Sequence, residues 1–142
     1  MTTIPESLIE IREYNEPGYR PLIDYQSWRV ALLNYIADDL PEKINRMQKH
    51  NETDEVFVLL AGHCILFLGE GEECVTKVCA VDMELYKLYN VKKGAWHWHT
   101  YSEDARVLVV ENRNTVSENS PIVGLSEAQQ KEVVEWTKKL WR

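Results

Sequence analysis

Three histidines and one glutamate lie at the ends of expected strands, where they could carry out chemistry together. His50 lies five residues before Glu55, and His97 and His99 are two residues apart further along the chain. Side chains alternate across a strand, so His97 and His99 share one face. Imidazole and carboxylate groups bind Zn, Fe, Mn or Ni, and they also transfer protons. These residue types therefore predict a polar site for a divalent metal ion or a small molecule.

The stretch QKHNETDEVFVLLAG resembles the first sequence motif of the cupin superfamily. That motif has two histidines one residue apart, then three or four residues, a glutamate, six residues and a glycine. His50, Glu55 and Gly62 match it with the correct spacing. Gln48 stands where cupins usually have the first histidine.

A later stretch, VKKGAWHWHTY, is similar to the second cupin motif and keeps Gly94 and His97. Lys92 stands in place of the usual proline, and Tyr101 in place of the usual asparagine. The resemblance covers about residues 25–113. It indicates a small single-domain cupin with degenerate metal motifs.

The resemblance implies an all-β fold, a cupin-type jelly-roll β-barrel, with a divalent metal ion (Zn, Fe, Mn or Ni) held inside. His50, Glu55 and His97 match ligand positions of that metal, and Gln48 or His99 is expected to complete the set. A second interpretation keeps these residues without a metal. They then form a hydrogen-bonded network or anchor an organic ligand.

Two further residues are candidates for catalysis. If the strand alternation extends backward from His50, Gln48 and Arg46 also face the interior. Arg46 then offers a planar guanidinium to a substrate carboxylate or phosphate, or forms a salt bridge at the rim. Tyr101 is a candidate for assisting proton transfer. His63 falls on the opposite face of its strand and is excluded from the site.

The elements that position these residues are mostly short strands. The run DEVFVLLAGHCILFLGEGEE is typical of a β-hairpin that turns at Ala61–Gly62. Many short strands separated by turns indicate a β-sandwich or a β-barrel. The other expected strands span about residues 25–36, 74–81, 83–91, 95–101 and 106–111.

The chain is expected to form one cupin domain over residues 1–142. Residues 1–24 are expected to form an irregular arm with room for one strand, and residues 25–113 the barrel core. Residues 125–142 predict an amphipathic C-terminal α-helix that docks on the barrel, and Ser126 begins a capping box there.

The composition of the chain argues against some classes of binding partner. The net charge of −7 and the pI near 5.1 argue against nucleic acid, because phosphate binding needs clustered Lys and Arg. No run approaches the roughly 20 apolar residues of a membrane span, and no signal peptide is visible, so no membrane partner is expected. Three cysteines without metal-type spacing indicate reduced thiols and a cytoplasmic location.

A homodimer is expected from the apolar outer face of the predicted hairpin. Monomers rarely leave more than a few hundred Å² of contiguous apolar surface exposed. Cupins also commonly pair in this way, as the resemblance implies. The residues expected on this surface are Val56, Val58, Leu60, Ile65 and Phe67, with Trp96 and Trp98 nearby.

Two functions remain open at this point. The first is a metal-dependent enzyme acting on a small polar molecule, as an isomerase, a lyase or a dioxygenase. The second is a non-catalytic, metal-free module that binds a small ligand in the barrel. The fold alone cannot choose between them, because this barrel supports many functions.

Overall fold

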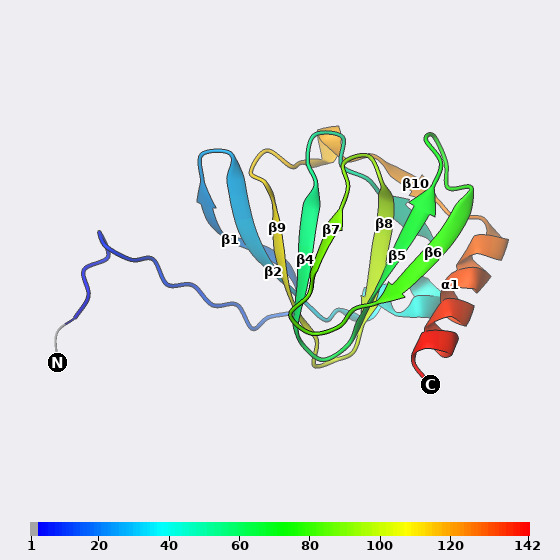
Figure 1. The fold of residues 1–142 in the computed structure, drawn as a ribbon, viewed down its shortest axis with the longest axis horizontal. Helices are drawn as coiled ribbons and strands as arrows, with labels where there is room; N and C mark the ends of the chain where they lie inside the picture. Colours follow the sequence, from blue (N-terminus) through cyan, green and yellow to red (C-terminus); the bar gives the residue numbers. More distant parts are fainter. Residues whose placement is uncertain (1–2) are drawn as a thin grey trace.

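Two five-stranded antiparallel sheets form the body of the computed structural model, which describes residues 3–142 (Figure 1). The first sheet has the order β1–β2–β9–β4–β7, and the second has the order β10–β3–β8–β5–β6. The first sheet contains β1 (Gly18–Tyr25), β2 (Trp28–Asn34), β4 (Glu55–Ala61), β7 (Leu88–Val91) and β9 (Arg106–Asn112). The second contains β3 (Arg46–Gln48), β5 (Cys64–Glu70), β6 (Lys77–Asp82), β8 (Trp96–Tyr101) and β10 (Ile122–Gly124).

This architecture confirms the predicted all-β barrel with a C-terminal helix. Every strand pair is antiparallel. Strands distant in sequence are neighbours in each sheet, as in a jelly roll. Three short 3-10 helices lie in the connections, at Ala37–Asp39, Pro41–Lys43 and Ser117–Asn119.

The predicted hairpin around Gly62 is wrong. Both strands exist, but β4 pairs with β7 and β9, whereas β5 pairs with β6 and β8. The chain therefore crosses from one sheet to the other at Gly62, which has a positive φ of 71°. An added Cβ there would lie 2.7 Å from the Ala105 backbone. Because both faces of the run are apolar, its pattern fits a crossing between packed sheets as well as a hairpin.

Strand alternation nevertheless places the interior side chains correctly. Phe57 and Leu59 from β4 pack in one buried cluster with Cys64 and Leu66 from β5. Alternation holds across the crossing because each strand keeps one face toward the other sheet. Glu55, the first residue of β4, is buried on the same side.

Helix α1 (Glu127–Leu140) covers the outer face of the second sheet (Figure 1). Its capping box is present as predicted, since Ser126 Oγ accepts from the Gln129 backbone N–H at 3.2 Å. Val133 is fully buried against Ile65 and Phe67 of β5. The helix therefore removes from solvent part of the surface that was expected to form a dimer interface.

The sequence also misplaced some strand boundaries. The expected strand at residues 25–36 begins only at Trp28, because Tyr25–Trp28 is the turn between β1 and β2. Strand β1 begins at Gly18, and it is the one strand for which the expected arm had room. Strand β10 was not expected at all, because three residues give no readable alternation. No helix within residues 3–142 is long and apolar enough to cross a bilayer.

Candidate metal and ligand site

Three elements bring the central side chains together. Glu55 opens β4 and His97 is the second residue of β8, and both face the barrel interior. His50 follows β3, and its carbonyl accepts from the Gly94 backbone N–H at 2.8 Å. Its ring is oriented by Ser120, whose Oγ lies 2.7 Å from His50 Nδ1. Two loops therefore fix His50, whereas regular strands fix Glu55 and His97.

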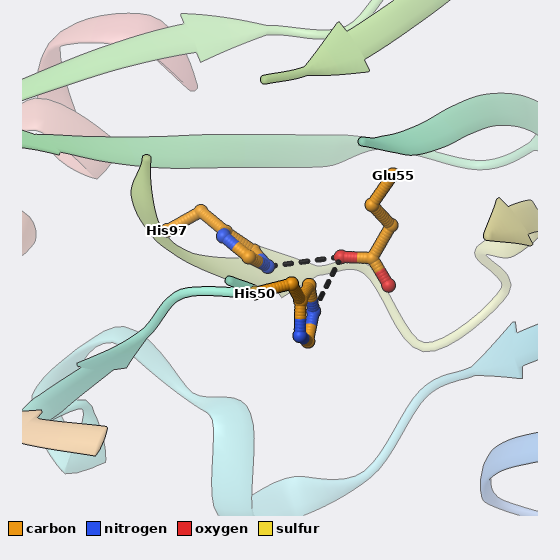
Figure 2. A group of neighbouring side chains, drawn as sticks. All are labelled: His50, Glu55 and His97. Carbon is orange, nitrogen blue, oxygen red and sulfur yellow. Dashed lines mark hydrogen bonds and ion pairs between the residues drawn. The ribbon is translucent and has the colours of Figure 1, made fainter. Parts of the chain in front are cut away.

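Both imidazole rings point at one carboxylate oxygen (Figure 2). His50 Nε2 lies 3.2 Å from Glu55 Oε1, and His97 Nε2 lies 2.9 Å from the same oxygen. All three residues are buried, and their candidate ligand atoms lie within 4.8 Å of one another. His97 Nδ1 lies 3.0 Å from the Ala95 carbonyl, so Nε2 is the nitrogen that faces the site. This donor set fits a divalent metal of the Zn, Fe, Mn or Ni type.

The pKa values of Glu55 and His97 depend on the contact between the two side chains. Burial alone would raise the pKa of Glu55, but hydrogen bonds from His50 and His97 hold it well below its usual range. Burial alone would lower the pKa of His97, but the hydrogen bond and negative charge of Glu55 raise it. The contact between His97 and Glu55 therefore favours the charged form of both side chains.

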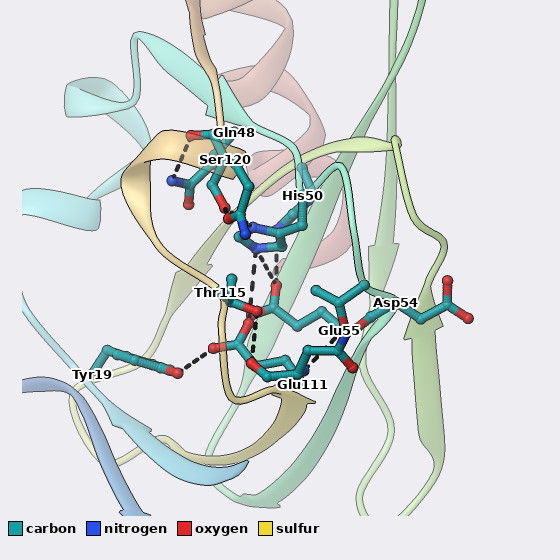
Figure 3. A network of polar contacts seen from close by, with 12 residues as sticks. Tyr19, Gln48, His50, Asp54, Glu55, Glu111, Thr115 and Ser120 are labelled. Atoms are coloured by element: carbon teal, nitrogen blue, oxygen red, sulfur yellow. Dashed lines mark hydrogen bonds and ion pairs between the residues drawn. The ribbon is translucent and has the colours of Figure 1, made fainter. Parts of the chain in front are cut away.

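A second carboxylate, Glu111, lies beside this group (Figure 3). Its Oε1 accepts from the Tyr19 hydroxyl and from Arg29 Nη2, the latter at 2.7 Å. Its Oε2 lies 4.0 Å from His50 Nε2. Burial and the neighbouring Glu55 raise the pKa of Glu111 to about 6. We refer to His50, Glu55, His97 and Glu111 as the Glu55 cluster.

A cavity of about 740 Å³ opens onto the Glu55 cluster. That volume suits a small organic molecule. Most of the predicted site residues line this cavity, but Tyr101 does not. His63, which was excluded from the site, does not line it either. The predicted site residues on its wall are Arg46, Gln48, His50, Glu55, His97 and His99.

The structure places Gln48 and His99 away from the converging atoms of the Glu55 cluster. Gln48 Nε2 donates to the Ser120 carbonyl at 3.3 Å, which holds the amide on the Ser120 side (Figure 3). His99 shares the face of His97, as predicted, but its Nε2 lies 3.3 Å from Asp39 Oδ2. His99 is therefore part of a different buried group.

That second group surrounds Asp39, and it includes Tyr101. The Tyr101 hydroxyl donates to Asp39 Oδ2, and the Trp98 indole donates to Asp39 Oδ1 at 3.0 Å. Tyr101 is buried among apolar side chains, and burial with the negative charge of Asp39 raises its pKa. Tyr101 does not line the cavity, and its role in proton transfer stays a prediction. We refer to Asp39, Trp98, His99 and Tyr101 as the Asp39 cluster.

The sequence did not identify Glu111, Arg29, Tyr19, Asp39 or Ser120 as parts of these clusters. Glu111 had a usable signal, because it keeps the alternation of the buried Val107 and Val109 at the end of its strand. Asp39 was expected only to interrupt a strand. Nothing in the local sequence shows that its carboxylate contacts β8.

Comparisons with known proteins place the fold but not the family. No protein-family model matches the chain. No curated protein matches it either. Among solved structures, the chain is similar to Streptomyces Pac13 with uridine, at a TM-score of 0.52 and 16% identity over 82% of this chain and 87% of that one. With another of its structures, Pac13 is described as a nucleoside dehydratase.

Two further structures extend the likeness. A 3,4-ketoisomerase from Helicobacter canadensis has a TM-score of 0.51 and 15% identity, over 75% of this chain and 74% of that one. A cupin-2 domain protein from Shewanella frigidimarina has a TM-score of 0.49 and 17% identity, over 70% of this chain and 85% of that one. The strand order and the likeness to Pac13 and to the ketoisomerase show that the protein has a cupin-type β-barrel fold, as its two motifs predicted.

Proposed function

We propose that this protein binds a small polar molecule in the barrel and acts on it as a metal-dependent isomerase or lyase. The observation that carries the proposal is the convergence of His50 Nε2 and His97 Nε2 on Glu55 Oε1 beside the cavity. The resemblance to cupins implies a metal at these three residues. When bound, such a metal supplies a Lewis acid that polarises a carbonyl or hydroxyl oxygen.

The residues around the converging atoms suit this role. The Ala95 carbonyl and Ser120 Oγ engage the far nitrogens of the two rings, which fixes the ring orientations. Arg46 and Lys43 lie on the cavity wall, where they provide positive charge for a carboxylate or phosphate group of the ligand. The structural neighbours include a nucleoside dehydratase and a 3,4-ketoisomerase. We therefore favour lyase or isomerase chemistry on a hydroxylated substrate over dioxygenation.

A second candidate function is a metal-free module that binds a small ligand without catalysis. The observation in its favour is that Glu55 Oε1 already has both His50 Nε2 and His97 Nε2 as partners, so its carboxylate is hydrogen-bonded without an ion. In that case the cavity holds the ligand through hydrogen bonds to the same side chains.

Metal analysis of the protein purified without chelator separates the two functions. The metal-dependent enzyme predicts about one divalent ion per chain in the wild type and none in His97→Ala. The matched control is His63→Ala, because His63 is exposed and outside the cavity. Equal metal content in the wild type and His97→Ala would reject the proposed site. A thermal-shift screen of uridine, nucleotide sugars and small carboxylates then tests the ligand class.

We further propose a homodimer that covers the outer face of the first sheet. Residues 3–13 extend away from the barrel (Figure 1), and exposed apolar side chains among them include Leu8 and Ile11. Val56 and Val58 are only half buried on the outer face of β4, and Leu88 of β7 is 76% exposed. Light scattering tests the assembly: a mass near 16.6 kDa, rather than twice that value, would reject the dimer.

A cytoplasmic location remains part of the proposal. Cys64, Cys74 and Cys79 are unpaired, which suits a reducing compartment.

A further inference from the structure

Glu111 is the side chain of the Glu55 cluster that no cupin motif accounts for. It lies on β9, directly opposite Arg29 of β2. The preceding residue, Val110, pairs with Val56 of β4, so Glu111 and Glu55 are cross-strand neighbours facing the interior. Two carboxylates side by side on one sheet face repel each other. Burial makes that repulsion stronger, because water no longer screens it.

The two oxygens of Glu111 have different surroundings. Oε1 accepts from the Tyr19 hydroxyl, from Arg29 Nε at 3.1 Å and from Arg29 Nη2 at 2.7 Å. Oε2 is buried without a hydrogen-bond partner, in a side chain that is 2% exposed. Such an atom costs about 1–3 kcal/mol if nothing satisfies it. Figure 3 shows the carboxylate lying between Tyr19 on one side and His50 and Glu55 on the other.

We propose that Glu111 Oε2 is a ligand of the metal, in place of the histidine that cupins have where this chain has Gln48. This inference rests on the proposed metal site at His50, Glu55 and His97. Nitrogen and carboxylate ligands lie about 2.0–2.2 Å from a metal such as zinc, so two ligands of one ion are at most about 4.4 Å apart. The 4.0 Å between His50 Nε2 and Glu111 Oε2 satisfies that limit.

Three of the six distances among the four ligand atoms agree with a single ion. They are the 4.0 Å from His50 Nε2 to Glu111 Oε2, the 3.2 Å from His50 Nε2 to Glu55 Oε1 and the 2.9 Å from His97 Nε2 to Glu55 Oε1. Glu111 is not among the three residues whose ligand atoms all lie within 4.8 Å of one another, so ligation requires its side chain to shift toward the ion. Gln48 does not compete, because its amide is held by the Ser120 carbonyl.

The resulting donor set has a chemical consequence. Two neutral imidazoles and two carboxylates carry a charge of −2, which a divalent cation neutralises. Carboxylate oxygens suit Mn²⁺ better than imidazole nitrogens do, so exchanging a histidine for Glu111 shifts the preference of the site toward Mn²⁺. The cation also satisfies Oε2 and removes the repulsion between Glu55 and Glu111.

The test measures Mn²⁺ binding to the full chain after removal of bound metal, by the loss of the free-ion signal in electron paramagnetic resonance. Glu111→Gln keeps a carbonyl that can accept from Arg29 and Tyr19, and it should lower Mn²⁺ affinity at least about tenfold. Gln48→Ala should leave the affinity within about twofold. Full affinity in Glu111→Gln, or a tenfold loss in Gln48→Ala, would overturn the assignment.

A second variant separates ligation from simple support of the fold. Arg29→Gln breaks the same ion pair but leaves the Glu111 carboxylate in place. A ligand role predicts equal or higher Mn²⁺ affinity in Arg29→Gln, because the carboxylate loses its competing cation. A purely structural role predicts the same loss as in Glu111→Gln and would refute the inference. If the wild type binds no divalent metal, the proposed metal site itself fails. If only His97→Ala loses the ion, this inference alone fails.

Discussion

The barrel interior contains two buried polar clusters along β8, and they differ in how completely their carboxylates are hydrogen-bonded. In the Asp39 cluster, Trp98 satisfies one carboxylate oxygen, and Tyr101 and His99 satisfy the other. In the Glu55 cluster, Glu111 Oε2 has no partner. The atom of the Asp39 cluster that has no partner is a nitrogen, His99 Nδ1, and both oxygens of its carboxylate are engaged. A satisfied carboxylate stabilises and positions the fold, whereas a buried carboxylate oxygen left open in a cavity indicates a place for a cation.

The clusters also differ in where their charge is balanced. Asp39 connects the first 3-10 helix to β8, since Thr100 Oγ1 also donates to the Asp39 backbone carbonyl at 2.7 Å. The Glu55 cluster has two carboxylates, of which Glu111 is paired with Arg29 and Glu55 with His50 and His97. We therefore interpret the Asp39 cluster as structural and the Glu55 cluster as the site of chemistry. The following predictions test that division.

The largest effect on stability is expected from Asp39→Ala. The change leaves the Trp98 indole N–H and the Tyr101 hydroxyl without their acceptor inside the protein, which should lower the free energy of unfolding by about 3 kcal/mol. Chemical denaturation of metal-free protein measures it. The matched control is Asp38→Ala, an exposed neighbour, which should stay within about 0.5 kcal/mol of the wild type. A loss below about 1 kcal/mol in Asp39→Ala would contradict the structural role.

The pH dependence of the same variant provides a further check. Burial alone would raise the pKa of Asp39, but the hydrogen bond and charge of His99, with hydrogen bonds from Tyr101 and Trp98, hold it below its usual range. An unfolded Asp titrates near pH 3.9, so the ionised Asp39 contributes fully above that pH. The contribution is lost as the pH falls through the lower, folded-state pKa. The stability difference between wild type and Asp39→Ala should therefore shrink in acid.

A smaller effect is expected from Tyr101→Phe. Only one hydrogen bond to Asp39 is lost, so the free energy of unfolding should fall by about 1 kcal/mol. Metal affinity and ligand-induced thermal shifts should stay unchanged, because Tyr101 does not line the cavity. The control is Tyr86→Phe, whose side chain is 70% exposed and which should be neutral. Loss of ligand binding in Tyr101→Phe would restore Tyr101 as a catalytic candidate.

Most of the fold could be predicted from the sequence because strand alternation and motif spacing are signals contained in short stretches of the chain. Alternation assigned the inner faces of β4 and β5, and motif spacing brought His50, Glu55 and His97 to one place. Neither signal contains the pairing of strands, so the Gly62 crossing was mistaken for a hairpin turn. For the same reason, the apolar Ile65 and Phe67 were expected at a dimer interface, although helix α1 buries them.

The unpredicted part of the two clusters depends on contacts between distant segments. Glu111 meets Arg29 and Tyr19 across more than 80 residues of sequence. Asp39 contacts Tyr101 at a sequence separation of 62 positions. Such contacts follow from sheet register, and no single stretch of the chain specifies register. A candidate site read from motifs therefore misses the side chains that neighbouring strands contribute.

The smallest effect on stability is expected from Arg46→Ala, at the mouth of the cavity. Arg46 is exposed, lines the cavity and lies over the Trp98 ring at 5.1 Å, and no salt bridge within residues 3–142 involves it. An exposed cation–π contact is worth about 0.5–1 kcal/mol, which bounds the loss of stability. The free guanidinium should instead bind the anionic group of a ligand.

Thermal shift with uridine monophosphate, compared with uridine, measures that binding. Arg46→Ala should reduce the shift from the phosphorylated compound more than the shift from the nucleoside, and Arg46→Lys should fall between Arg46→Ala and the wild type because it keeps the charge without the planar fork. The matched control is Arg20→Ala, since Arg20 makes the same kind of contact with Tyr14 at 5.7 Å, outside the cavity. If Arg46→Ala and Arg20→Ala change both shifts equally, Arg46 only packs on Trp98, and the cavity mouth has no anion subsite.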